Sequence, residues 1–483
     1  MGEHGSFTDE EPLFDESAGG GERKISVVRI SSVAALGGFL FGYDSAVING
    51  AVAAVQDQYD VASGPLGFAV ASALLGAAVG ALSAGRVADR LGRLSVMKMA
   101  AVLFLVSAVV TGLATSMWVF ILGRILGGVG VGVASVIAPA YIAEIAPAHV
   151  RGRLGSLQQL AIVTGIFLSL LVDFLLAAAA GGSRELLWLG LEAWRWMFLA
   201  MIVPALAYGI LSLTIPESPR FLVANNRIPE ARRVLEGLLG PKNLEHTINR
   251  IQETLKDRTR PRWSDLKAPT GGLYPIVWVG LFLSIFQQFV GINVIFYYSN
   301  ILWEAVGFSE RNSFIITVIT AVVNVGTTLI AIATVDRFGR KPLLLIGSVG
   351  MAVTLATMAI IFGTAPINAE GAPVLAGATG PIALVAANLF VVSFGMSWGP
   401  IVWVLLGESF PNRIRAAALS LAAGAQWVAN WLITVSFPAM KDLSLGVAYG
   451  FYAVCAVLSF FFVLKFVRET KGMELEDMRH RTT

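Results

Sequence analysis

The sequence has little charge and almost no cysteine. Only 14% of its 483 residues are Asp, Glu, Lys or Arg, whereas soluble proteins carry about 25%. Together with a hydrophobic content of 56%, this deficit of charge excludes a soluble enzyme and a soluble binding module. The single cysteine, Cys455, excludes an intrachain disulfide but does not identify the cellular compartment.

Signals for export, metal binding and catalysis are also lacking. The first residues have no apolar signal-peptide core and are rich in Gly and acidic residues, so residues 1–26 are predicted to form a disordered cytoplasmic tail. No His or Cys residues have metal-ligand spacing, no nucleophile–base set is recognisable, and no Gly-rich loop follows a strand. We therefore expect no metal, no cofactor, no nucleic-acid partner and no enzymatic activity.

Long apolar blocks are what the sequence has instead. About 20 helical residues cross about 30 Å of hydrocarbon, and twelve blocks reach that length, which predicts an all-α membrane protein with twelve transmembrane helices. In the fourth block, the glycines from Gly123 to Gly132 are expected to allow close helix packing. The blocks are Ile30–Ala54, Leu66–Gly85, Val96–Leu113, Trp118–Ile142, 155–178, 195–215, 274–302, 313–335, 342–363, 381–407, 416–438 and 446–467.

The distribution of positive charge predicts the orientation of the chain. Most of the 35 Lys and Arg residues fall in the two tails, the alternate loops and the long central loop. By the positive-inside rule these segments, and therefore both termini, are cytoplasmic. The predicted organisation is an N-terminal six-helix bundle at 27–215, a helical cytoplasmic linker at 216–273, a C-terminal six-helix bundle at 274–467 and a tail at 468–483.

The two halves repeat each other, and the repeated elements are charged. "DRLGR" at 89–93 recurs as "DRFGR" at 336–340, and an acid followed seven residues later by a base recurs at 144–151 and 408–415. Such parallel duplication places a site between two bundles at mid-depth. The charges either anchor the cytoplasmic loops or form a cytoplasmic gate that locks the bundles together in one state, and we favour the gate. Its predicted members are Asp89, Arg93, Glu144, Arg151, Asp336, Arg340, Glu408 and Arg415.

These motifs carry a family resemblance. "DRLGR", "PESPR", "QQFVGINVIFYYS", "DRFGRKP", "ESFPNRIRAAAL" and "RETKG" resemble the signatures of the sugar porter family of the major facilitator superfamily, over about 27–471. One departure is "RETKG", where the family usually has "PETKG". The chain is most similar to the bacterial glucose and xylose proton symporters. The resemblance implies the major facilitator fold, alternating access and a monosaccharide substrate.

Neutral amides and indole rings inside the spans suit a sugar. Amides match sugar hydroxyls without a buried charge, and an aromatic ring covers the apolar face of the sugar. Any one amide could equally join helices, but so many at family positions favour a binding site. Ile166, where the xylose symporter has a polar residue, favours glucose. The predicted binding residues are Gln159, Gln287, Gln288, Asn293, Asn324, Trp403, Gln426, Trp427 and Asn430.

Three ionisable residues fall inside spans. Asp44 lies about 22 Å from the inner side on the first span, and Arg124 lies about 21 Å from it on the fourth, so the two are predicted to pair. Either the pair is purely structural, or Asp44 binds the coupling proton. The resemblance supports coupling, since proton-coupled members carry Asp at this position and facilitative members carry Asn. Asp173, near the outer end of the fifth span, is expected to be solvated.

The function predicted from the sequence is proton-coupled uptake of a monosaccharide, with D-glucose preferred. A facilitative hexose uniporter, a symporter of xylose or another pentose, and a transporter-like sugar sensor remain alternatives. The sensor is disfavoured because the tail after Val467 is short. The partners would be the sugar, the proton and the lipid bilayer. We expect a monomer in the inner, or plasma, membrane of a bacterium.

Overall fold

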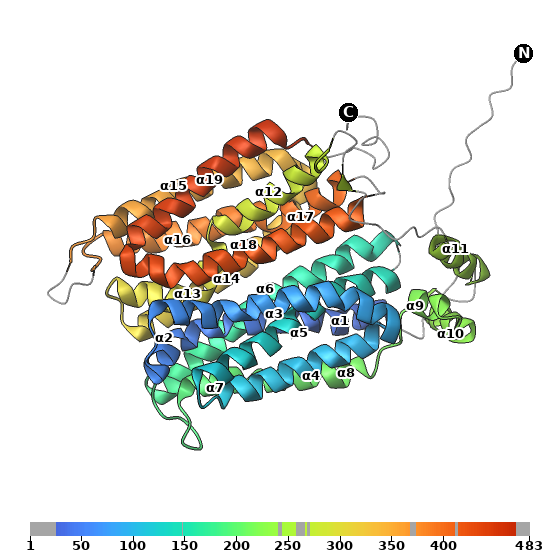
Figure 1. Ribbon diagram of the computed structural model, residues 1–483, viewed down its shortest axis with the longest axis horizontal. Coiled ribbons are helices and arrows are strands. Elements are labelled where there is room, and N and C mark those ends of the chain that lie inside the picture. The colour runs from blue at the N-terminus through green and yellow to red at the C-terminus, as the bar shows by residue number, and fades with distance from the viewer. Residues whose placement is uncertain are drawn as a thin grey trace, which may run out of the picture.

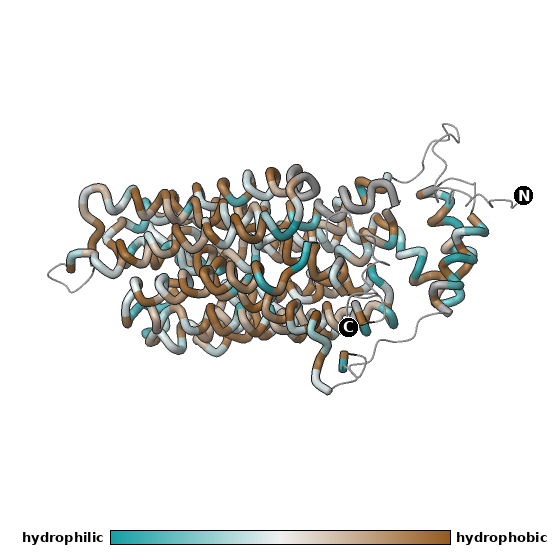
Figure 2. Tube along the Cα trace, turned by 90° about the horizontal axis from the view of Figure 1, so that it is seen from above, coloured by the Kyte–Doolittle hydropathy of each residue, from teal (hydrophilic) through white to brown (hydrophobic). Residues whose placement is uncertain are grey.

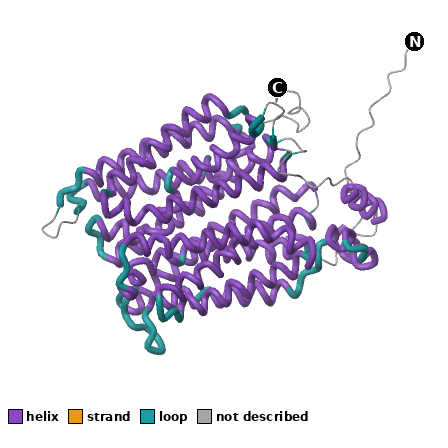
Figure 3. The backbone as a smooth tube through the Cα atoms, in the orientation of Figure 1, coloured by secondary structure: helices purple, strands orange, loops and turns teal. Residues whose placement is uncertain are grey.

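The computed structural model describes residues 26–146, 148–239, 244–256, 266–267, 271–367, 373–410 and 414–469. Within these ranges the chain is almost entirely helical (Figure 3). Most of the two predicted tails and parts of the predicted linker lie outside the described residues. In the described part of the chain, the only β pairing consists of isolated bridges such as that between Leu186 and Glu192.

The helices form two bundles that lie side by side (Figure 1). The N-bundle contains α1 (Val27–Ala46), α2 (Ile48–Tyr59), α3 (Ser63–Leu91), α4 (Arg93–Gly112), α5 (Met117–Ile145), α6 (Ala148–Ala180), α7 (Ala193–Leu199) and α8 (Ile202–Ser212). The C-bundle contains α12 (Pro275–Phe289), α13 (Ile292–Ala305), α14 (Glu310–Phe338), α15 (Arg340–Gly363), α16 (Thr379–Gly395), α17 (Trp398–Ser409), α18 (Arg415–Leu443) and α19 (Leu445–Phe466). Across the interface, α3 packs on α18 and α6 packs on α14.

Twelve of the described helical segments are long and apolar enough to cross a membrane. This confirms the predicted all-α class with twelve membrane-spanning helices. The long helices are mostly hydrophobic, and the small helical group at one end of the molecule is more hydrophilic (Figure 2). A lipid-facing surface accounts for the many large apolar side chains that stay exposed, such as Val79, Leu82 and Ile346.

Three short helices fall within the predicted linker at 216–273. They are α9 (Pro219–Ala224), α10 (Ile228–Leu239) and α11 (Leu244–Lys256), and they lie at one end of the bundles (Figure 1). They have a small core of their own that includes Phe221, Leu235 and Ile248. We call this end of the bundles the inner end and the opposite end the outer end.

Four of the spans are interrupted. The first span breaks at Val47 between α1 and α2, and the seventh breaks at Val290 and Gly291 between α12 and α13. Gly291 has φ +81°, a left-handed conformation that glycine adopts without strain. The first and seventh spans are equivalent in the duplicated halves, and interruptions at corresponding positions are typical of transporter binding sites.

Glycines bring α3 and α5 into backbone contact. A Cβ atom on Gly128 or Gly132 of α5 would lie 1.9 or 2.0 Å from a backbone oxygen of α3, and one on Gly76 or Gly80 of α3 would lie 2.2 or 2.3 Å from a backbone oxygen of α5. Each helix therefore carries a small-xxx-small pair facing the other. This confirms the packing role predicted for the glycine-rich fourth block.

We predict that Gly132→Ala lowers the melting temperature of the detergent-solubilised protein. The added methyl group would meet the Ala77 carbonyl oxygen at 2.0 Å, and overpacking of this kind destabilises by about 1–3 kcal/mol. Gly85→Ala is the matched control on α3, because nothing lies within 4 Å of its Cβ position. Equal melting temperatures for the two variants would contradict the proposed backbone contact.

Candidate functional site

Asp44 of α1 and Arg124 of α5 form a buried pair. Their side chains are 1% and 2% exposed, and the Arg124 Nη1 atom lies 3.5 Å from Asp44 Oδ1. The predicted contact between the two residues therefore exists. Neither carboxylate oxygen of Asp44 accepts a hydrogen bond from a described residue. The carboxylate therefore interacts with Arg124 as an ion pair without a hydrogen bond.

The hydrogen bond of Arg124 goes to the backbone instead. Its Nη1 atom donates to the Asp44 carbonyl oxygen at 2.9 Å. Because α1 ends at Ala46, this carbonyl belongs to the last turn, where helix carbonyls have no intrahelical partner. The guanidinium also lies 5.9 Å from the Phe198 ring centroid, a cation–π distance. Arg124 is thus fixed by contacts that do not require an ionised Asp44.

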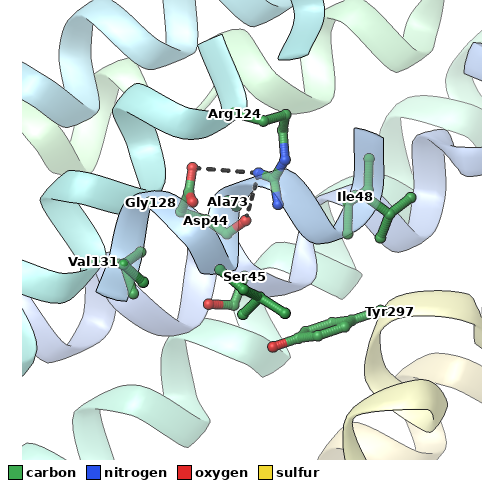
Figure 4. Close-up of a pocket in the computed structure, with 11 residues that line it drawn as sticks. Asp44, Ser45, Ile48, Ala73, Arg124, Gly128, Val131 and Tyr297 are labelled. Atoms are coloured by element: carbon green, nitrogen blue, oxygen red, sulfur yellow. Dashed lines mark hydrogen bonds and ion pairs between the residues drawn. The ribbon is translucent and has the colours of Figure 1, made fainter. Parts of the chain in front are cut away.

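A small cavity adjoins this pair at the interface of the bundles. Asp44, Ser45, Ile48 and Arg124 line its N-bundle side, and Tyr297 of α13 closes it from the C-bundle (Figure 4). Ser45 also lines the cavity, and Asn430 of α18 lies near Tyr297. Tyr297 thus lies between the surroundings of Asp44 and one of the predicted sugar-binding amides.

The predicted amides of the seventh span lie around its break. Gln287 Nε2 donates to the Trp398 and Gly399 carbonyl oxygens at 2.9 and 3.2 Å. Asn293 Nδ2 donates to Gln288 Oε1 at 2.6 Å. The Oε1 atom of Gln287 is buried without a hydrogen-bond partner, which leaves an acceptor open to a sugar hydroxyl.

The predicted residues of α18 also face the interface between the bundles. Gln426 Oε1 is buried without a partner, and Asn430 accepts a hydrogen bond from Thr434 at 3.2 Å. The Trp427 ring lies 6.2 Å from that of Phe41 in the N-bundle. These residues, with Gln287, provide amide acceptors and an aromatic ring from two helices of the C-bundle, α12 and α18.

Three further predicted sugar-binding residues lie on other helices. Gln159 of α6 is exposed, Asn324 of α14 is partly buried, and Trp403 of α17 is 45% exposed. Among the described residues of the predicted set, only Asn293 and Gln288 are joined to each other by a side-chain hydrogen bond. Their part in binding remains a prediction.

The predicted cytoplasmic gate is described in part, and the following bonds of its described residues lie within one bundle. Arg93 pairs with Glu144 at 2.9 Å and with Asp89 at 3.1 Å. In the C-bundle, Glu469 accepts hydrogen bonds from the backbone N–H groups of Arg340 and Lys341 at 2.9 and 3.0 Å. The side chains of four predicted gate residues lie outside the described part, namely Arg151, Asp336, Glu408 and Arg415.

The expectation that Asp173 is solvated is wrong. Its side chain is 0% exposed, because α2 packs over it with Gly50 in contact with the carboxyl group. The span break that creates α2 was not predicted, and neither were the position of Tyr297 beside Asp44 and the hydrogen bond from Asn49 Nδ2 to the Phe296 carbonyl oxygen of the opposite bundle. The glycine at 291 and the paired tyrosines in "INVIFYYS" are the signals that could have pointed to the seventh span.

The chain was compared with known proteins and protein families. A family model described as "Sugar (and other) transporter" matches residues 30–481. A glucose transport protein of Synechocystis is 58% identical over 94% of this chain and 97% of the relative. The D-xylose-proton symporter of Escherichia coli K12 is 38% identical over 94% of this chain and 95% of its own.

Solved structures agree with these relatives. The E. coli xylose transporter in an inward-open conformation superposes with a TM-score of 0.80 at 38% identity, covering 94% of this chain and 99% of that one. The structure of the proton:xylose symporter bound to 6-bromo-6-deoxy-D-glucose has a TM-score of 0.74 at 37% identity, and the match covers 94% of this chain and 98% of the symporter. The chain therefore belongs to the sugar transporter family, the sugar porters of the major facilitator superfamily.

Proposed function

We propose that this sugar porter imports a monosaccharide together with a proton, with D-glucose as its preferred substrate. The observation that carries the proposal is the buried Asp44–Arg124 pair, in which the carboxylate is at 3.5 Å and Arg124 has a separate backbone bond. Burying an unpaired charge in a membrane protein is expensive. Protonation of Asp44 would remove the ion pair and leave Arg124 with the Asp44 carbonyl and Phe198.

The sugar would bind where the amides of α12, α13 and α18 meet. The open acceptors of Gln287 and Gln426 suit sugar hydroxyl donors, and Trp427 suits the apolar face of the ring. Glucose is favoured by Ile166 and by the relative at 58% identity, which is named a glucose transport protein. A pentose remains the second candidate, because a relative at 38% identity is named a D-xylose-proton symporter.

Alternating access is supported by the bonds that join the outer ends of the bundles. Ser183 N donates to Glu310 Oε1 at 2.9 Å, and Ser63 Oγ donates to Asp442. The TM-score is also higher for the inward-open structure, 0.80, than for the sugar-bound one, 0.74. We infer that this conformation is closed at the outer end, and that the charged motifs of the inner end form the opposing gate.

The proposal includes the location and orientation of the protein. We infer a monomer in the bacterial inner membrane with both termini in the cytoplasm. The outer end, remote from α9–α11, would then face the periplasm or the exterior, and sugar and proton would both enter there.

Asp44→Asn should abolish proton coupling but not sugar movement. In wild-type proteoliposomes, D-glucose entry should alkalinise the outside. The variant should still exchange labelled glucose across the bilayer but move no protons, because the amide cannot titrate and Arg124 keeps its backbone bond. The matched control is Asp57→Asn on the same span, which removes a half-exposed carboxylate paired with Arg184.

A facilitative uniporter predicts a different pattern. Wild type would then move glucose without protons, and Asp44→Asn would leave glucose flux unchanged. If xylose rather than glucose elicited the proton signal in wild type, the coupling would stand and the proposed substrate would be wrong.

Gln287→Ala should weaken sugar binding by about 10- to 100-fold, since loss of a buried hydrogen-bonding group costs about 1–3 kcal/mol. The KM for D-glucose should rise, and the sugar-induced increase in melting temperature should shrink. Asn388→Ala in α16 is the matched control, because its Oδ1, like Oε1 of Gln287, is buried without a partner, but the amide is not in the predicted site and its Nδ2 bonds within its own helix, to the Leu384 carbonyl oxygen at 2.9 Å. Equal effects of both variants would place the sugar elsewhere.

A further inference from the structure

A single asparagine joins the bundles at the outer end by bonding into a helix of the opposite bundle. Asn49 Nδ2 donates to the Phe296 carbonyl oxygen at 3.0 Å, and Asn300 N donates to Asn49 Oδ1 at 3.0 Å. In an uninterrupted α-helix, the N–H of residue 300 bonds to the carbonyl of residue 296. Asn49 therefore bonds both backbone atoms of one turn of α13. We call these two contacts the Asn49 bridge.

The bridge has two features of a switch. It is fully buried, with Asn49 1% and Asn300 3% exposed, so its loss would leave polar groups without partners unless α13 satisfied them itself. When the bundles separate, Phe296 and Asn300 can bond each other within α13. The Asn49 bridge and the intact helical turn are thus alternative states of the same backbone groups.

Gly50, the residue next to Asn49, packs against the side chain of Asp173. A Cβ atom on Gly50 would lie 2.7 Å from both Cβ and Oδ2 of Asp173, so the carboxyl group touches the backbone of α2. Asp173 is seven residues from the end of α6 at Ala180, about 10 Å along the helix. The carboxyl group is thus covered by the same first turn of α2 that carries the bridge.

No cation accompanies this carboxyl group among the described residues. Neither of its oxygens has a hydrogen-bond partner there, and the backbone of Gly50 packs directly against it. Tyr43 of α1 donates its hydroxyl proton to the Met197 carbonyl oxygen at 3.3 Å rather than to Asp173. Most charged groups at this end have partners elsewhere or are exposed: Asp44 with Arg124, Asp57 with Arg184, Glu192 with Arg195, Glu310 with Ser183 N, and Arg311 at the surface. Glu304 of α13 is a further titratable group of the outer end, and it lies among Glu310, Arg184 and Asp57 rather than at Asp173.

We propose that Asp173 is a second proton-binding residue, which holds a proton while the outer end is closed and releases it when the outer end opens. An ionised carboxylate with no partner in such a site is strongly disfavoured, whereas a neutral carboxyl group can be covered by Gly50. Release of the proton to outer water would create a charge that needs hydration. Hydration requires α2 to move off Asp173, and this movement withdraws Asn49 from α13.

This inference rests on the alternating-access transport proposed above but not on the role of Asp44. If both hold, closure of the outer end would take up a proton at Asp173 in addition to the proton carried by Asp44. If Asp44 does not couple, Asp173 would still make the outer closure depend on the outer pH, with closure favoured at acidic pH.

Infrared spectroscopy of the purified protein tests the protonation directly. In Asp44→Asn, the C=O stretch of a protonated carboxyl group should persist at neutral pH, and Asp44→Asn/Asp173→Asn should lose that intensity. Identical carboxyl spectra for the two variants would overturn the proposal. This measurement does not depend on transport, so it is separate from the test of Asp44.

Distance measurements between spin labels test the link to the outer closure. Labels at Gly64→Cys and Leu443→Cys, in a Cys455→Ser background, report the separation of α3 and α18 at the outer end. Wild type should shift towards longer distances from mildly acidic to mildly alkaline pH. Asp173→Asn should lose this shift and stay closed, and Asn49→Ala should populate the open distance at every pH.

The control for these distances is Asp57→Asn, which should keep the wild-type shift. An undiminished pH shift in Asp173→Asn would overturn the role of Asp173, even if Asp44→Asn loses proton coupling as expected. A closed distance for Asn49→Ala at all pH values would overturn the role of the Asn49 bridge. If Asp173→Asn does not fold, Asp173→Ser serves as the second variant.

Discussion

The structure depends on one constraint: a polar group in a membrane interior needs a partner from the protein, because hydrocarbon offers none. Where a span breaks, backbone groups that lose their helical partners need new ones from the protein. Arg124 provides one for the Asp44 carbonyl at the end of α1, and Gln287 adds side-chain bonds to the Trp398 and Gly399 carbonyls next to the break of the tenth span. The polar residues that hold the broken helices together are therefore the residues available for function.

The same constraint explains why the breaks are paired between the two halves. The first and seventh spans are interrupted at equivalent positions, and the short outer helices that result, α2 and α13, contact each other through Asn49. Asn49 bonds the Phe296 carbonyl and the Asn300 N–H, which would otherwise bond each other within α13. The interface between the bundles can therefore be polar, specific and reversible without burying a charge.

The sequence was sufficient for the twelve spans, their duplication and the contact of Asp44 with Arg124, because long apolar blocks and isolated intramembrane charges have few structural solutions. It was not sufficient for Asp173. Counting residues along α6 placed it near the outer end, where water was expected, but only the break at Val47 and the fold of α2 over it bury the side chain. Gln159 and Trp403, which are exposed, illustrate the same limit of prediction. The position of a residue along a helix predicts its depth in the membrane, but its contacts across the interface depend on the conformation of both bundles.

Coupling between sugar and proton must pass through the contacts between the bundles. The two buried carboxyl groups, Asp44 and Asp173, lie in the N-bundle, whereas all but one of the predicted sugar-binding residues lie in the C-bundle. Tyr297 lines the cavity beside Asp44 and lies near Asn430 of α18, and Asn49 bonds to α13. In the proposed function, a sugar that reorients Asn430 would change the surroundings of Asp44 through Tyr297. The broken seventh span carries both Tyr297 and the partner groups of Asn49, so it is the segment through which the two sites would be coupled.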